Sequence, residues 1–267
     1  MASGMASARI VHGHIGLGPL TSNLLYPFPW KDDYPAWQEW ADELERLLSF
    51  ADSQGQMPAF LPRLKTDRRN QRDEALNELR VAFFLHRNGF PIVVWEPAGL
   101  RGKVGEYSVR VPEGITVFTE VKSPGWESEL DSAERLAGRT KLPKYIDGDG
   151  GAFANWEGIR KCIASSKTYP KFSPTQPNLL VIADDFFVSL HDSEWQTQIA
   201  LYFDRSSYGS ETGYFSSSEY ANLGGVGVFG AFVEAGKIRV DYRFRVYNNP
   251  FALTQTRLPE SILALRV

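Results

Sequence analysis

The sequence predicts a mixed α/β domain in which a central β-sheet is flanked by helices. Three observations lead to this prediction: helix-type apolar periodicity before residue 90, a run of β-type segments from 91 to 122, and alternating helical and β-type segments thereafter. The composition agrees, because 43% of the 267 residues are hydrophobic and 23% are charged, which is ordinary for a globular protein.

The N-terminal part is expected to be an arm followed by two helices. Residues 1 to about 30 are rich in Gly and Pro and lack periodicity, so they predict an irregular segment. Apolar residues at helical spacing predict a helix over Tyr34–Phe50, which Gln54–Pro62 should interrupt. A second helix is predicted over Arg72–Arg87, ending at Asn88-Gly89, a common C-terminal signal.

Strands then dominate the central part of the chain. The predicted elements are, in order, strands at Pro91–Trp95, Glu106–Val111 and Ile115–Lys122, a short helix at Glu127–Ala137, a helix at Trp156–Thr168, a buried strand at Leu179–Ala183, a helix from Ser193 to Phe203, and strands at Val226–Val233 and Ile238–Tyr247 joined near Ala235-Gly236. This order predicts three parts: an arm and helix (1–65) packed on an α/β core (66–190), and a C-terminal helix and hairpin (191–267) in the same domain.

Charge and cysteine content narrow the classes of function. The net charge of −3 argues against a protein that coats nucleic acid by charge alone. Basic residues do gather locally, in a first group from Arg63 to Arg72 and a second between 139 and 171, although solvated surface is the commoner reading of either group alone. A single cysteine, the lack of an apolar run of roughly 20 residues and the lack of a secretory signal predict a cytoplasmic location.

The most informative stretch is the predicted hairpin between residues 106 and 122. Pro112-Glu113-Gly114 has proline where a type I turn needs φ near −65° and glycine where a left-handed residue belongs. Centring the hairpin on Glu113 pairs Val109 with Val117 and Tyr107 with Thr119. Glu106 then falls directly opposite Glu120.

Directly opposed residues point to the same face of a sheet, and Lys122 shares that face with Glu120. The opposite face collects an apolar set fit for a core: Tyr107, Val109, Val111, Ile115, Val117, Thr119 and Val121. Like charges opposite each other destabilise a sheet, so the facing carboxylates predict a bound cation.

Glu78 adds a third acid on the preceding helix. Ala75, Val81, Ala82 and Leu85 stand at helical spacing around it, which places Glu78 on or beside the apolar face. Burying a lone carboxylate is costly, so this position predicts a charged partner or a metal.

A helix bearing Glu78, a strand opening at Glu106, and a strand carrying Glu120-Val121-Lys122, followed by a helix and a buried strand, resemble the PD-(D/E)XK nuclease family. The resemblance covers roughly residues 70 to 190 and implies a restriction-endonuclease-like core. It departs from the family at Glu106, where the family usually has Asp preceded by Pro.

The resemblance also implies a chemistry. Glu106 and Glu120 would bind Mg²⁺, with Mn²⁺ able to substitute, and Glu78 would be an auxiliary ligand. Lys122 would position the attacking water, and Lys167, or failing it Lys161, would be the basic residue of the following helix. Double-strand cleavage would pair two copies as a homodimer. Nucleic acid, DNA rather than RNA, would be held by basic residues of the second group: Lys141, Lys144, Arg160, Lys161 and Lys171.

Two alternatives stay open at this stage. The first alternative to a nuclease is a nuclease-like fold kept as a binding or assembly module without catalysis, which Glu106 and the acidic balance favour. The second is an unrelated α/β interaction protein in which acid-x-Lys is accidental. The sequence does not choose between endo- and exonucleolytic action, nor among biological roles that share this fold.

Overall fold

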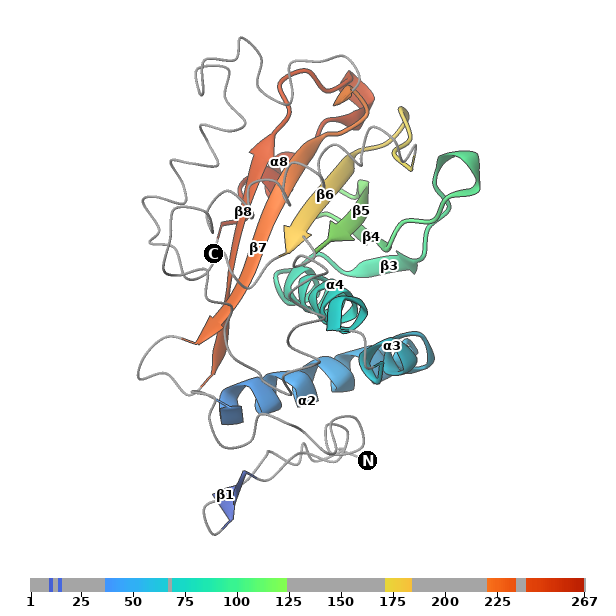
Figure 1. Ribbon diagram of the computed structural model, residues 1–267. Coiled ribbons are helices and arrows are strands. Elements are labelled where there is room, and N and C mark those ends of the chain that lie inside the picture. The colour runs from blue at the N-terminus through green and yellow to red at the C-terminus, as the bar shows by residue number, and fades with distance from the viewer. Residues whose placement is uncertain are drawn as a thin grey trace, which may run out of the picture. The chain divides into compact units, whose positions relative to one another are not determined.

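The computed structural model describes residues 10–11, 14–15, 37–66, 69–123, 171–183, 220–233 and 239–266 (Figure 1). The helices are α2 (Trp37–Ser53), α3 (Met57–Leu64), α4 (Arg69–Arg87) and α8 (Glu260–Leu263), with 3₁₀ turns η1 (Leu100–Gly102) and η6 (Thr254–Thr256). The strands are β1 (Ile10–Val11), β2 (His14–Ile15), β3 (Ile92–Trp95), β4 (Tyr107–Arg110), β5 (Thr116–Lys122), β6 (Asn178–Ala183), β7 (Gly225–Val233) and β8 (Val240–Asn248).

A mixed six-stranded sheet confirms the predicted α/β class. Its strand order is β3-β4-β5-β6-β7-β8, so each strand neighbours the next one along the chain (Figure 1). The β3–β4 and β4–β5 pairs are antiparallel, whereas β5–β6 and β6–β7 are parallel. Every residue of β6 is buried, as its continuous apolar run predicted.

The chain divides into two compact units, each with its own internal contacts. The first comprises Met1–Phe83, Gly125–Asp147 and Phe232–Asp241, and the second comprises Phe84–Pro124, Gly148–Ala231 and Tyr242–Val267. None of the helices in the described ranges has the length and apolar character that a membrane crossing requires.

In the first unit, one prediction is wrong, at α3, and one strand pair, β1–β2, was not predicted. Residues Met57–Leu64 form α3 although Gln54–Pro62 was expected to break the helix. Pro58 lies in the first turn, where a missing N–H costs nothing, and Phe60 and Leu64 bury an i,i+4 apolar stripe. The surprise is the β1–β2 antiparallel pair within the arm that was expected to be irregular.

A buried ion pair, which the sequence did not predict, joins α2 to α4 in the first unit. The Arg80 guanidinium donates to both carboxylate oxygens of Glu43, with Nη2 to Oε2 at 2.8 Å. Both side chains are at most 3% exposed, and Arg80 also lies over the ring of Trp40, 5.0 Å from its centroid.

The end of α4 follows the sequence signal closely. Gly89 adopts φ +88° and the Phe90 N–H donates to the Leu85 carbonyl, the pattern of a glycine-terminated helix. In the second unit, the Phe84 ring of the last helical turn contacts Phe229 of β7 and Phe244 of β8.

The β4–β5 hairpin has the predicted register. Tyr107 pairs with Thr119 and Val109 with Val117, and Gly114 adopts φ +78° in the turn. The predicted apolar face is buried except at Ile115, which is 43% exposed beside the turn. The helices predicted at 127–137, 156–168 and from Ser193, and the connection near Ala235-Gly236, lie outside the described residues.

Candidate functional site

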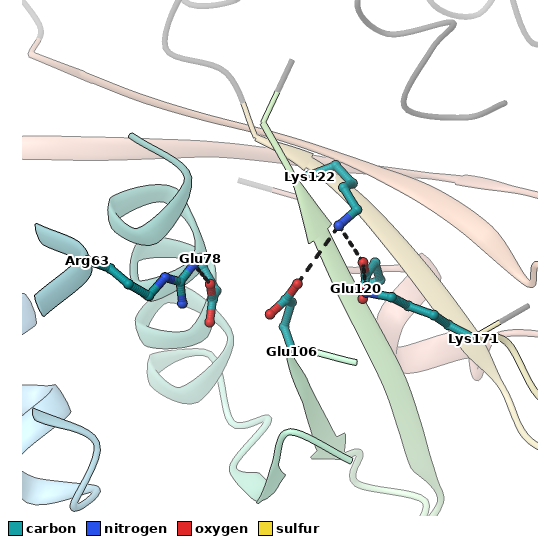
Figure 2. A network of polar contacts seen from close by, with 6 residues as sticks. All are labelled: Arg63, Glu78, Glu106, Glu120, Lys122 and Lys171. Atoms are coloured by element: carbon teal, nitrogen blue, oxygen red, sulfur yellow. Dashed lines mark hydrogen bonds and ion pairs between the residues drawn. The ribbon is translucent and has the colours of Figure 1, made fainter. Parts of the chain in front are cut away.

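Four charged side chains of the second unit, Glu106, Glu120, Lys122 and Lys171, form what we call the charged cluster (Figure 2). Continuing the β4–β5 register by one step beyond Tyr107 and Thr119 brings Glu106 opposite Glu120. Lys122 lies two residues further along β5, on the face that Glu120 shares. The hairpin register therefore places Glu106, Glu120 and Lys122 on one face of the sheet.

Glu120 is the centre of the cluster and is only 2% exposed. Its Oε1 accepts a hydrogen bond from Lys171 Nζ and forms an ion pair with Lys122 Nζ at 2.6 Å. Its Oε2 is buried, and no hydrogen-bond partner for it exists among the described residues. Two ammonium groups thus contact Oε1 of Glu120, whereas no hydrogen-bond donor among the described residues reaches Oε2.

Lys122 reaches between the two carboxylates, as Figure 2 shows. Its Nζ lies 4.0 Å from Glu106 Oε1, which is beyond hydrogen-bonding distance, so this contact is electrostatic. Both side chains are partly exposed, Lys122 more than Glu106. A solvent-accessible ammonium beside two carboxylates is therefore present at the acid-x-Lys position.

The backbone at Glu106 is held by contacts with Glu96 and with the β5 side chain Phe118. Its carbonyl accepts from the Glu96 N–H at 2.9 Å, and Glu96 has the unusual φ of +49° for a residue other than glycine. At Gly105 the Phe118 ring lies so close that a Cβ would fall 2.2 Å from it. The chain leading into Glu106 is thus fitted against the β5 side chain two residues before Glu120.

Lys171 enters the cluster from a segment that is remote in sequence. Lys171 was predicted to be one of the basic residues that hold nucleic acid, and its contact with Glu120 was not predicted. The neighbouring Phe172 packs edge-on against Phe118, with ring centroids 5.9 Å apart. Only a strand order placing residues 171–183 beside β5 could have revealed this contact, and no local signal in the sequence carries it.

In the first unit, Glu78 is buried as predicted and has a charged partner. Arg63 Nη2 donates to Glu78 Oε2 at 2.6 Å (Figure 2). The Arg63 guanidinium also lies over the Phe60 ring. Arg63 belongs to the first basic group noted in the sequence. Because each unit is described by itself, membership of Glu78 in the charged cluster stays a prediction.

The remaining predicted site residues, Lys141, Lys144, Arg160, Lys161 and Lys167, lie outside the described residues. Within the described ranges no three His, Cys, Asp or Glu side chains gather as a metal-binding group would require. Mg²⁺, however, commonly uses only one or two carboxylates together with substrate phosphate oxygens and water. Glu106 and the bare Oε2 of Glu120 are hard donors of that kind, so the residues present fit this ion.

Comparison of the chain with family models, with curated proteins and with solved structures yields no match.

Proposed function

We propose that the chain is a Mg²⁺-dependent phosphodiesterase acting on nucleic acid, DNA in preference to RNA, with a PD-(D/E)XK type of core. One observation carries the proposal: the Lys122 ammonium lies 2.6 Å from the buried Glu120 carboxylate and 4.0 Å from the facing Glu106 carboxylate. The antiparallel β4–β5 pair followed by the parallel, buried β6 supports a restriction-endonuclease-like core.

Each residue of the cluster has a role in this proposal. Glu106 and Glu120 hold the Mg²⁺ ion, which when bound offsets charge on the scissile phosphate and makes water a better nucleophile. Lys122 donates a hydrogen bond to the attacking water and orients it toward the phosphate. Burial of Glu120 keeps its carboxylate in one orientation, because its hydrogen bonds are shielded from competing water.

Several further assignments belong to the same proposal. Glu78 acts as an auxiliary ligand, directly or through water, and Lys167 contributes a basic group from the following helix. Basic residues between 139 and 161 hold the phosphate backbone, two copies pair for double-strand cleavage, and the enzyme works in the cytoplasm.

Cleavage assays with matched variants test the proposal. Supercoiled, linear and single-stranded DNA and RNA are incubated with the purified chain in Mg²⁺, Mn²⁺ or EDTA. We expect metal-dependent cleavage, reduced by about 100-fold or more in Glu120→Ala and in Lys122→Ala. Lys103→Ala removes an exposed lysine of the same unit and should cleave like the wild type.

A second candidate function is a binding or assembly module that performs no catalysis. The observation that favours it is the charge balance of the cluster, in which two ammonium groups already offset two carboxylates without a metal. A folded wild type that cleaves no substrate with either ion, and that binds neither ion by calorimetry, would favour this candidate over the nuclease.

A further inference from the structure

Lys171 gives Glu120 more positive charge than neutralisation of that carboxylate requires. Lys122 alone, at 2.6 Å from Oε1, supplies one full charge, and Lys171 brings a second ammonium to the same oxygen. Each ammonium group attracts the carboxylate, so Lys171 is a second cation on an oxygen that Lys122 already contacts. Lys171 is also less exposed than Lys122, at 14% against 32%, and is therefore less screened by solvent.

The backbone around Lys171 is held firmly enough to keep the ammonium in place. The Lys171 carbonyl accepts from the Leu100 N–H at 3.2 Å, and Phe172 packs against Phe118 of β5. A few residues later, the Asn178 side-chain amide donates to the carbonyls of Ser173 and Asn222, each at 2.7 Å. The segment that carries Lys171 is thus hydrogen-bonded to η1 through the Lys171 carbonyl and to β6 through the Asn178 side chain.

We infer that Lys171 is the resident counterion of Glu120 and sets the affinity of the site for divalent cations. It orients the buried carboxylate through Oε1, and its positive charge opposes a cation that approaches the same carboxylate. It is a positioning residue, because it acts on the metal through Glu120. This inference rests on the proposed function, since it takes Glu120 to be a metal ligand.

Metal titration of neutral and charged variants tests the inference without any substrate. Mn²⁺ binding to the full chain is measured by calorimetry for wild type, Lys171→Met, Lys171→Gln and Lys171→Arg. A unit charge a few ångströms from a divalent ion changes its binding strongly, so we expect the Met and Gln variants to bind Mn²⁺ about tenfold more tightly. Lys171→Arg keeps the charge and should bind within about twofold of the wild type.

The outcomes separate this inference from the nuclease proposal. Unchanged or weaker Mn²⁺ binding in both neutral variants, or no binding in any protein, overturns the role of Lys171. Cleavage that depends on Glu120 but no affinity change at Lys171 would leave the enzyme standing and remove the inference. Tighter Mn²⁺ binding by the neutral variants, without cleavage by the wild type, would support the role of Lys171 and remove the nuclease proposal.

Folding of the variants is monitored by circular dichroism. Lys171→Gln retains a donor for Oε1, so we expect it to fold more readily than Lys171→Met. If both neutral variants unfold in metal-free buffer, recovery of the fold by Mn²⁺ supports the counterion role, because the ion then replaces the missing charge. Failure of Mn²⁺ to restore the fold overturns it.

Discussion

Gly105 is the residue whose lack of a side chain lets the Phe118 ring lie beside the start of β4. The ring is fully buried and is held on another side by Phe172, so it has little room to retreat. Glu106 follows directly, and its carboxylate position therefore depends on a glycine that carries no chemistry of its own.

We expect Gly105→Ala to lower the free energy of unfolding by about 2 kcal/mol, the usual cost of forcing extra volume into a packed site. Urea denaturation measures this change. A double variant, Gly105→Ala with Phe118→Leu, should be less destabilised than the sum of the single changes, because the smaller side chain makes room. Strict additivity of the two changes would show that the ring does not occupy that space.

The residue scale also shows where sequence reasoning succeeded. The facing position of Glu106 and Glu120 followed from the turn residues Pro112 and Gly114, because side chains in a short hairpin are placed by local rules. Lys171 lies 51 residues from Glu120, and its contact depends on the order of strands in the sheet. No periodicity or turn signal contains that information.

At the scale of elements, the buried ion pair between Arg80 and Glu43 joins α4 to α2. Arg80→Met leaves the buried Glu43 carboxylate without its guanidinium, which we expect to cost about 3 kcal/mol of unfolding free energy. Glu43→Leu combined with Arg80→Met should recover a large part of this loss, since both charges are then gone. Equal stability of the single and double variants would contradict the coupling.

The β4–β5 turn is also linked to the C-terminal helix α8. Glu113 accepts hydrogen bonds from the Ser261 hydroxyl at 2.7 Å and from the Ser261 N–H at 3.1 Å. The hydroxyl bond above all, and the backbone bonds after it, hold the pKa of Glu113 below its usual value of 4.5. The turn that sets the register of the cluster is therefore tied to a distant part of the second unit.

This link predicts a pH dependence of stability. Because the folded-state pKa of Glu113 is depressed, its contribution is fully present above about pH 4.5 and is lost as the pH falls through the folded-state value. Glu113→Ala should lower Tm at pH 7 and approach the wild-type Tm as the pH drops below that range. Ser261→Ala should behave alike, and a pH-independent difference for both variants would exclude the carboxylate as the cause.

For elements as for residues, prediction followed local signals. The end of α4 at Gly89 and the start of the β3 strand came from glycine and β-type patterning, and the structure agrees. The short helix α3 was missed because Gln54–Pro62, which contains two prolines, was expected to interrupt the helix. Its helical state is favoured by the burial of Phe60 and Leu64, which is a tertiary effect.

On the scale of the whole molecule, metal binding should be visible as stability. An ion that binds only the folded state at ten times its Kd adds about 1.4 kcal/mol to the free energy of unfolding. We therefore expect Mn²⁺ to raise the Tm of wild type relative to EDTA, and to leave Glu120→Ala nearly unchanged. An equal rise in both proteins would place the ion elsewhere in the chain.

The mixed sheet itself was predicted in class and in most strand positions, because β6 and the hairpin have strong sequence patterns. Of the charged cluster, only the association of Glu106 with the β5 residues Glu120 and Lys122 was predicted. Lys171, from the segment before β6, comes beside them only when the whole second unit folds.

The contact of Phe118 with Gly105 and Phe172 has a consequence for how this sequence can diverge. A side chain at position 105 requires a smaller one at 118, and loss of the ring at 118 leaves position 172 without its packing partner. Among related chains that keep the charged cluster, positions 105, 118 and 172 should therefore covary as a set.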